Sequence, residues 1–293
     1  MSLRERLVPV VAAVAVLAVG MAVIVLLRGA TNDGITALED AKQAQVSTTA
    51  RSFNARVESS LGSLGGLGAR PWELTEDSEA DQSVLDTFAV DPDARSGSFL
   101  VNADDTITAG VLLQPGELGG QYDAPGWAEA KAELLSQPAV VLPVTDAGVT
   151  TDLPSYAFAV AIPGADPGTL RGAVIFEAAL TADSAFSQEI EALAAGGGSS
   201  GVWRFVDSNG VVLATSASSG LGEPVSDLDV MGLDSGRVVT DGDLLVFAAD
   251  APIVGWRVVF TQERDEFVEP LAGPLRVAGL VLVLLMLVAL GRA

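Results

Sequence analysis

The chain has 293 residues, 49% of them hydrophobic, and its 38 acidic and 16 basic side chains give a formal net charge of -22. This length allows one or two domains with a sizeable core, and so negative a surface repels phosphate backbones, which excludes nucleic acid as a partner. The absence of cysteine and histidine excludes disulfides, thiol chemistry, zinc sites with Cys or His ligands and His-dependent triads, so we expect no enzyme, no cofactor and no metal.

The first predicted element is a membrane-spanning helix over residues 7–27, which carry no charge. A helix of this length, at 1.5 Å per residue, spans about 30 Å, the thickness of a bilayer core. Arg4 and Arg6 lie in the segment 1–6 before it, which favours a cytoplasmic N-terminus. A cleaved signal peptide is the alternative, but the residues that follow make a poor cleavage site. We therefore expect an uncleaved anchor.

A long stalk helix is predicted next, over residues 34–68. Apolar or small side chains spaced by three or four residues form a stripe along it, at Val46, Ala50, Phe53, Val57, Leu61 and Leu64. This stripe can pack on its own domain or pair with a second copy of the chain, and a homodimer is among the expected assemblies. A cluster of glycines and a proline then ends the helix.

Beyond the stalk, the sequence pattern changes to short strands and hairpins that occur twice. Two pairs of segments match in the same order, 96–109 with 200–214 and 156–176 with 244–260. A duplication in one order predicts two similar antiparallel α+β lobes, over residues 69–195 and 196–270. The glycine-rich residues 196–201 form the joint between them.

A second membrane span is predicted over residues 271–291. The segment is apolar apart from Arg276, which can extend toward the membrane interface, and Arg292 follows it. Two spans with a cytoplasmic N-terminus place both ends in the cytoplasm and the bulk of the chain outside it, with the lipid bilayer as a partner. The sequence stops two residues after Gly291, so we expect the output domain in a longer chain or in a separate cytoplasmic or membrane partner.

The order of a long helix, two such lobes and a return helix resembles the double Cache family of extracytoplasmic sensor domains. The resemblance covers about residues 40–270 and rests on SGSFLVNADDTITAG, YAFAVAIPG, GVWRFVDSNGVVLATS and APIVGWRVVFTQERDEF. It implies an α+β fold with two tandem PAS-like lobes after the long helix, flanked by the two transmembrane helices. It also implies a small-molecule sensing module of a bacterial signal-transduction receptor. The alternative function is a non-catalytic structural or scaffolding ectodomain of a cell-envelope complex.

The resemblance further implies that the ligand binds in the first, membrane-distal lobe. Members that bind amino acids have an Arg two residues before a Trp, a Tyr after it, and an acid on the last strand of that lobe. Here Trp127 and Glu177 match, but Pro125 and Ala128 stand at the Arg and Tyr positions. Loss of the Arg removes the bidentate clamp for an α-carboxylate, so a cationic or neutral ligand is expected.

The ligand-binding residues that we expect are aromatic and acidic side chains of the first lobe, Tyr122, Trp127, Tyr156 and Glu177. Aromatic rings beside a carboxylate suit an amine, through cation–π contacts and charge-assisted hydrogen bonds. Alternatively the aromatic residues fill the core, and Glu177 forms a surface ion pair with Arg171, six residues earlier on the same strand face. If Glu177 lines a pocket, Glu177→Gln is expected to abolish amine binding and to leave the melting temperature of the unliganded protein nearly unchanged.

The remaining motifs indicate structure rather than chemistry. Residues 102–105 and 207–210 are predicted turns, because neither continues to the ligand set of an EF-hand. Residues 197–201 match G-x-S-x-G, but the chain has no histidine to activate the serine. Trp203 and Trp256 stand at strand starts among apolar residues, and we expect both in the core.

Overall fold

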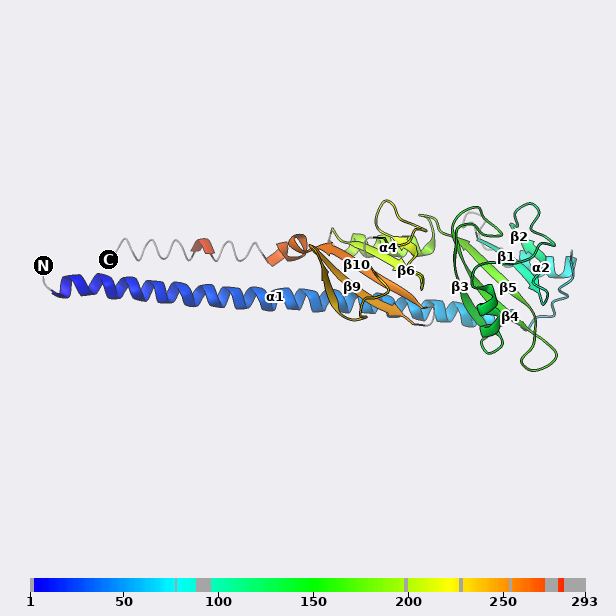
Figure 1. The fold of residues 1–293 in the computed structure, drawn as a ribbon, viewed down its shortest axis with the longest axis horizontal. Coiled ribbons are helices and arrows are strands. Elements are labelled where there is room, and N and C mark those ends of the chain that lie inside the picture. Colours follow the sequence, from blue (N-terminus) through cyan, green and yellow to red (C-terminus); the bar gives the residue numbers. More distant parts are fainter. Residues whose placement is uncertain are drawn as a thin grey trace.

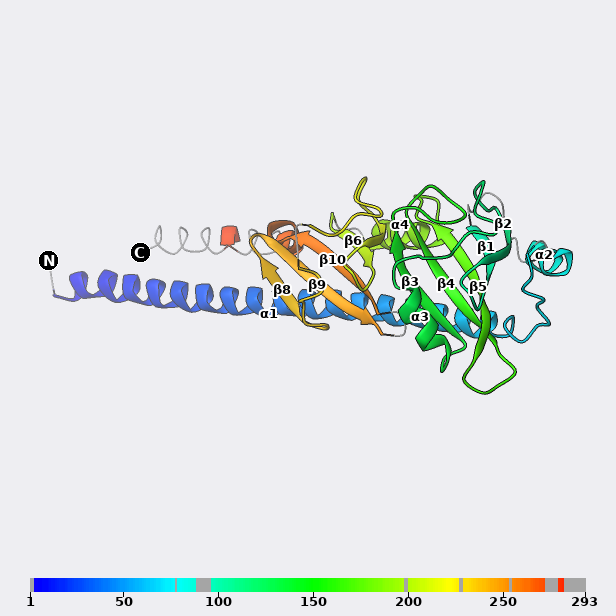
Figure 2. The same ribbon diagram turned by 45° about the vertical axis from the view of Figure 1, so that its right-hand side comes forward.

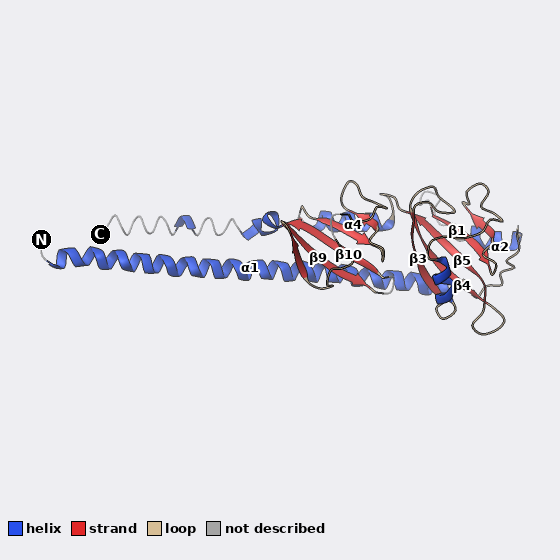
Figure 3. Ribbon diagram, in the orientation of Figure 1, coloured by secondary structure: helices blue, strands red, loops and turns tan. Residues whose placement is uncertain are grey.

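A computed structural model describes residues 3–76, 78–87, 96–197, 200–226, 229–252, 255–271 and 279–281, with the side chains of residues 3–27 outside the description. Its dominant element is one continuous helix, α1 (Leu3–Gly65), of 63 residues. At 1.5 Å per residue this helix is about 95 Å long. It runs along the molecule, and two separate sheets follow one another beside its C-terminal half (Figures 1 and 3).

The lobe farther from the N-terminal end of α1, called the distal lobe here, is built on a five-stranded antiparallel sheet. The strand order is β2-β1-β5-β4-β3. Its strands are β1 (Ser96–Asn102), β2 (Ile107–Val111), β3 (Ala139–Thr145), β4 (Ser155–Pro163) and β5 (Leu170–Ala179). Two short helices complete it, α2 (Glu79–Asp86) and α3 (Trp127–Leu134).

The other lobe, the proximal lobe, repeats this arrangement with the strand order β7-β6-β10-β9-β8. Its strands are β6 (Val202–Val206), β7 (Val212–Thr215), β8 (Val238–Asp241), β9 (Leu244–Ala251) and β10 (Trp256–Glu263). The helix α4 (Ala185–Gly197) joins the two lobes. Strand for strand the two orders are the same, and Figure 2 shows both sheets beside α1 from a second direction. The prediction of two related antiparallel lobes is confirmed.

The duplication extends to the first hairpin of each lobe. Asn102 Oδ1 accepts hydrogen bonds from the backbone N–H groups two and four residues later, at 3.0 and 2.9 Å. Asp207 Oδ1 accepts from the same two positions, both at 2.8 Å. A short polar side chain that binds its own backbone in this way fixes a tight turn. Both segments are therefore turns, as predicted.

The apolar stripe of α1 packs on the chain's own lobes, most of it on the proximal lobe and its last residue, Leu64, on the distal lobe. Val46, Ala50, Phe53 and Val57 are between 0% and 4% exposed and belong to one core cluster with the proximal sheet. Of the two predicted uses of the stripe, the structure shows the packing on its own domain, and a homodimer stays a prediction. Trp203 and Trp256 are buried in the same cluster, which confirms their place in the core.

In the part of the chain that the structure describes, no helix is both long and apolar enough to cross a bilayer. The side chains of the first predicted span lie outside that part, and so does most of the second, residues 271–291. Leu271, where the second predicted span begins, packs against Gly34 of α1: a Cβ added to this glycine would lie 3.2 Å from Leu271 Cδ1. The chain thus returns to α1 at the N-terminal side of the proximal lobe.

Candidate functional site

A cavity of about 230 Å³ opens in the distal lobe. It lies on the sheet face that α3 covers, between the segment that connects β2 to α3 and the loop that follows β3. Its polar lining comprises three carboxylates, two hydroxyls and an amide: Glu117, Asp123, Glu177, Tyr122, Thr145 and Gln121. None of the described residues that line it is basic. We call it the acidic cavity.

Glu177, on β5, is 5% exposed. Both oxygens of its carboxylate accept hydrogen bonds. Oε1 accepts hydrogen bonds from the backbone N–H of Val149 at 3.2 Å and from Ser155 Oγ at 3.0 Å. Oε2 accepts from the backbone N–H and the hydroxyl of Thr150, both at 2.6 Å. Gly148 permits this close approach, because a Cβ there would lie 1.9 Å from Oε1. Glu177 therefore anchors the loop over the cavity and gives one wall its negative charge.

The same loop also reaches the proximal lobe. At its start, the backbone N–H of Val144 donates a long hydrogen bond, 3.5 Å, to Oδ2 of the buried Asp207. At its end, Pro154 lies so close to Gly222 that a Cβ on this glycine would be 2.9 Å from it. The segment 144–154, called the linking loop here, comprises the last two residues of β3 and the loop after it, and it contacts both the acidic cavity and the proximal lobe.

Two of the predicted aromatic residues lie together at this site. Tyr122 lines the cavity, and its ring packs edge-on against Trp127 with centroids 5.1 Å apart. Trp127 is behind Tyr122 rather than in the lining, and its indole N–H donates to Asp105 Oδ1 at 2.8 Å. The same carboxylate oxygen accepts from Lys131 Nζ at 2.7 Å. Trp127 thus supports the wall of the cavity.

The third predicted aromatic residue, Tyr156, lies on the opposite face of the sheet. Its neighbour Ala157 is the residue that pairs with Glu177 across β4 and β5, and successive side chains of a strand point to opposite faces. The Tyr156 ring instead contacts Phe186 and Trp256, with centroids 5.3 and 5.7 Å away. The structure therefore does not bring Tyr156 to the cavity.

The alternative ion pair between Arg171 and Glu177 does not form. Six residues of extended strand separate the two side chains by about 20 Å. Arg171 donates to the backbone carbonyl of Trp72 at 2.8 Å. The expected shared strand face required an unbroken strand, but Arg171 is the extra residue of a β-bulge, because Ile162 pairs with Gly172 and Pro163 with Leu170.

Both tyrosines of the chain are expected to resist ionisation. Burial raises the pKa of each, and for Tyr122 the negative charge of Glu177 raises the pKa further. An exposed tyrosine has a pKa of about 10. Folding stability linked to these groups is therefore constant below that pH and falls as the pH rises above it, since the unfolded chain loses protons that the folded chain keeps.

An absorbance titration checks this expectation. Folded protein should show no tyrosinate signal at pH values where the chain in urea is already half ionised. A titration of the folded protein that coincides with the unfolded one would contradict the burial of both rings.

Glu117, Asp123 and Thr145 line the cavity but were not among the residues expected from the sequence. Glu117 and Asp123 lie on the connection between β2 and α3, where no strand or helix period fixes which way a side chain points, and Thr145 is the last residue of β3, after an irregularity in its register with β4. The only signal in the sequence was the placement of acids near the Trp127 motif. A chain with 38 acids offers many such placements.

No family model and no curated protein matches the chain. Among solved structures, the ligand-binding domain of Mlp24 with asparagine superposes with a TM-score of 0.53 at 18% identity, over 81% of this chain and 97% of that one. The ligand-binding domain of the Pseudomonas aeruginosa chemoreceptor PctC with GABA gives 0.53 at 16%, over 77% and 99%. The extracellular domain of the putative histidine kinase rpHK1S-Z16 gives 0.55 at 11%, over 78% and 95%.

The chain has the fold of these extracellular sensor domains. The match spans most of this chain and nearly all of each neighbour, so it includes both lobes and the part of α1 beside them. At these identities the shared property is the fold. The resemblance to double Cache sensors seen in the sequence is confirmed at that level.

Proposed function

We propose that the chain is the extracytoplasmic sensing module of a membrane-bound receptor and that its acidic cavity binds a small amine. The single observation that carries the proposal is the cavity lining, in which Glu117 and Asp123 present carboxylates, the hydrogen-bonded Glu177 adds negative charge, and no described residue is basic. An ammonium group gains charge-assisted hydrogen bonds there, whereas the carboxylates would repel an anion. The module itself binds and does not catalyse.

The ligands of the structural neighbours support this choice. Asparagine and GABA, named with two of them, each carry one ammonium group and one carboxylate. A cavity without a base can hold the first group but offers no partner for the second. We therefore expect an amine that has no carboxylate. Tyr122, whose raised pKa keeps its hydroxyl protonated, adds an aromatic wall next to the carboxylates.

The route of the signal follows from the ends of the described fold. Leu271 returns to α1 at Gly34, so two membrane spans would enter the bilayer side by side, with both termini in the cytoplasm. A ligand that stabilises one position of the distal lobe would bias the relation of these two helices. An output partner in the cytoplasm or membrane, and a second copy of the chain, are the remaining parts of the proposal.

The proposal is tested by thermal shift on the full chain in detergent. Primary amines should raise the melting temperature, by an amount equivalent to about 2.7 kcal/mol at a concentration of 100 times Kd. Carboxylic acids and α-amino acids of similar size should not. Asp123→Asn should lower the affinity for the amine at least tenfold. Glu129 is an exposed carboxylate on α3 outside the lining, and Glu129→Gln should leave the affinity unchanged.

A melting temperature that stays flat with every ligand class would favour the structural or scaffolding alternative. Stabilisation by carboxylic acids but not by amines would overturn the choice of ligand charge and leave the sensing function standing.

A further inference from the structure

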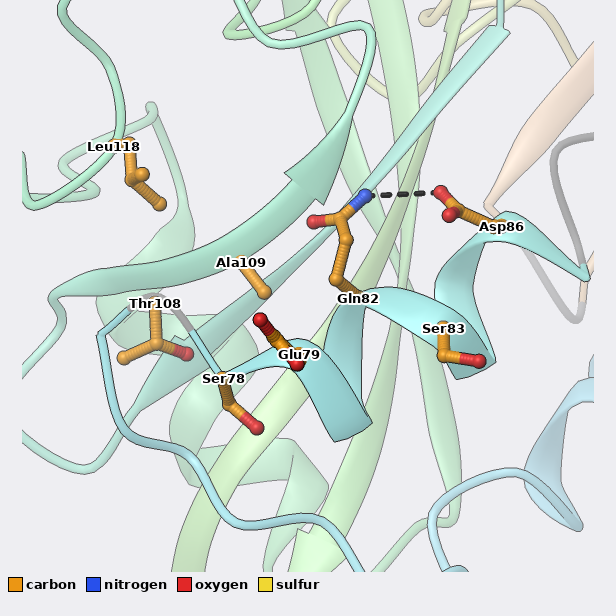
Figure 4. A pocket seen from close by; sticks show the side chains of 8 residues that line it. All are labelled: Ser78, Glu79, Gln82, Ser83, Asp86, Thr108, Ala109 and Leu118. Atoms are coloured by element: carbon orange, nitrogen blue, oxygen red, sulfur yellow. Dashed lines mark hydrogen bonds between the residues drawn. The ribbon is translucent and has the colours of Figure 1, made fainter.

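A second and larger cavity, of about 350 Å³, lies at the outer edge of the distal lobe between α2 and β2. The helix turns a polar face toward it, made of residues spaced by three and four positions: Glu79, Gln82, Ser83 and Asp86. Thr108 and Ala109 of β2 form the opposite wall, and Leu118 closes one side (Figure 4). We call this space the α2 groove.

Thr108 is held in the wall of the groove by an irregularity in its strand. Across β1 and β2, Leu100 pairs with Ala109 and Val101 pairs with Ile107, so Thr108 is an extra residue in a β-bulge. The side chain is 2% exposed, and its hydroxyl has no hydrogen-bond partner among the described residues. In Figure 4 this hydroxyl points toward the first turn of α2. A buried polar atom without a partner is uncommon in native proteins.

The proximal lobe has a residue at the position equivalent to Thr108, and there the side chain is part of the apolar core. Its first hairpin has the bulge at the equivalent place, between Phe205 and Val206, and the extra residue is Leu213. Leu213 is fully buried in an apolar cluster that includes Ile190 of α4, which packs over β7. The duplicated lobe thus fills this space with hydrocarbon, whereas the distal lobe has a hydroxyl and a groove.

The charge and shape of the groove indicate the chemistry of a ligand. Its ionisable side chains are both acids, and no described residue of the lining is basic. Glu79 and Asp86 are seven residues apart on one helix face, about 10.5 Å along the axis. Gln82 Nε2 donates to Asp86 Oδ1 at 2.9 Å and holds that carboxylate at its end of the groove. In Figure 4 the Gln82 side chain lies between the two acids, Ala109 lies next to Glu79, and Leu118 is farther away on the side opposite Asp86.

We infer that the α2 groove is a second ligand site, distinct from the acidic cavity beside Glu177, and that it binds an aliphatic diamine or polyamine. One ammonium group pairs with Glu79 and another with Asp86. The methylene chain between them covers the stem of Gln82 and Ala109, and the Thr108 hydroxyl, on the Glu79 side of the groove, accepts a hydrogen bond from the ammonium N–H at that end. A monoamine can make only one of the two ion pairs, so separated positive charges are the specific requirement.

The test is isothermal titration of the full chain in detergent with spermidine at physiological ionic strength, with propylamine as the monoamine probe. Thr108→Leu, which copies Leu213, should lower the affinity for spermidine at least tenfold. Its melting temperature should be equal to or above that of the wild type. The double variant Glu79→Gln/Asp86→Asn should lower the affinity for spermidine as much. Propylamine at equal concentration should not saturate this site.

Two controls separate a built site from attraction to a negatively charged protein. Glu129→Gln/Glu133→Gln removes two exposed carboxylates from one face of α3 and should leave spermidine binding unchanged. Asp123→Asn, in the other cavity, should remove only the binding that spermidine shares with propylamine and leave its affinity for the α2 groove unchanged. The inference is overturned if wild-type protein does not bind spermidine, if both double variants lose equal affinity, or if Thr108→Leu binds like the wild type. Loss with Asp123→Asn alone would assign spermidine to the acidic cavity instead.

Discussion

Glu177→Gln is expected to lower the free energy of unfolding by about 3 kcal/mol, since hydrogen bonds to a buried charged group contribute about 1.5–3 kcal/mol each. The carboxylate accepts from two backbone N–H groups, those of Val149 and Thr150, one on each oxygen. A glutamine has one accepting oxygen and one NH2 group, so at least one of these N–H groups would face a donor. The linking loop would lose part of its anchor.

This result would reverse the expectation from the sequence, in which Glu177→Gln leaves stability unchanged. Chemical denaturation of the full chain, followed by tryptophan fluorescence, measures the loss. Glu133→Gln, at an exposed position of α3, is the matched control and should stay within about 0.5 kcal/mol of the wild type. If Glu177→Gln unfolds at the same denaturant concentration as the wild type, the four hydrogen bonds of Glu177 do not hold the loop in solution.

Phe53→Ala is expected to lower the free energy of unfolding by about 4 kcal/mol. This is a typical loss when a buried phenylalanine is truncated to alanine in a packed core. Phe53 is 1% exposed. Its ring centroid lies 4.4 Å from that of Phe205, 5.1 Å from Phe186 and 5.5 Å from Trp256. Tyr156 of the distal lobe contacts Phe186 and Trp256 in turn, so the cavity left behind would loosen the joint between the lobes.

Denaturation at several protein concentrations also distinguishes the two predicted uses of the α1 stripe. Because Phe53 packs within its own chain, the loss should not depend on protein concentration. Glu58→Ala, at an exposed position of α1, should leave stability within about 0.5 kcal/mol. A loss that appears only at high concentration would mean that Phe53 stabilises a dimer.

The architecture could be predicted because its signals are periodic and repeated. A stripe at helical spacing on α1 and two hairpins of matching order were enough for the long helix and the two lobes. The same reasoning placed Trp203 and Trp256 in the core, where both are buried. Apolar burial follows directly from composition and period, so the long helix, the two lobes and their core can be predicted from the sequence.

The site was only partly predictable, because it depends on strand register and on loops. Tyr156 and Glu177 are both on strands of the distal sheet, yet a shift of one residue moves a side chain to the other face, and the register that pairs Glu177 with Ala157 turns Tyr156 away. Thr108 borders the α2 groove because of a bulge. No local pattern in the sequence marks either feature.

The linking loop has a consequence for how this protein can vary. Surface loops ordinarily tolerate changes in length, because few contacts tie them down. This loop is tied to Glu177 by Val149 and Thr150, and to the proximal lobe through Val144 and Pro154. A single residue inserted between these attachments would leave one of them unmade. Its length is therefore constrained by these attachments, although both its ends belong to the distal sheet, and we expect insertions in sequences of this architecture to avoid it.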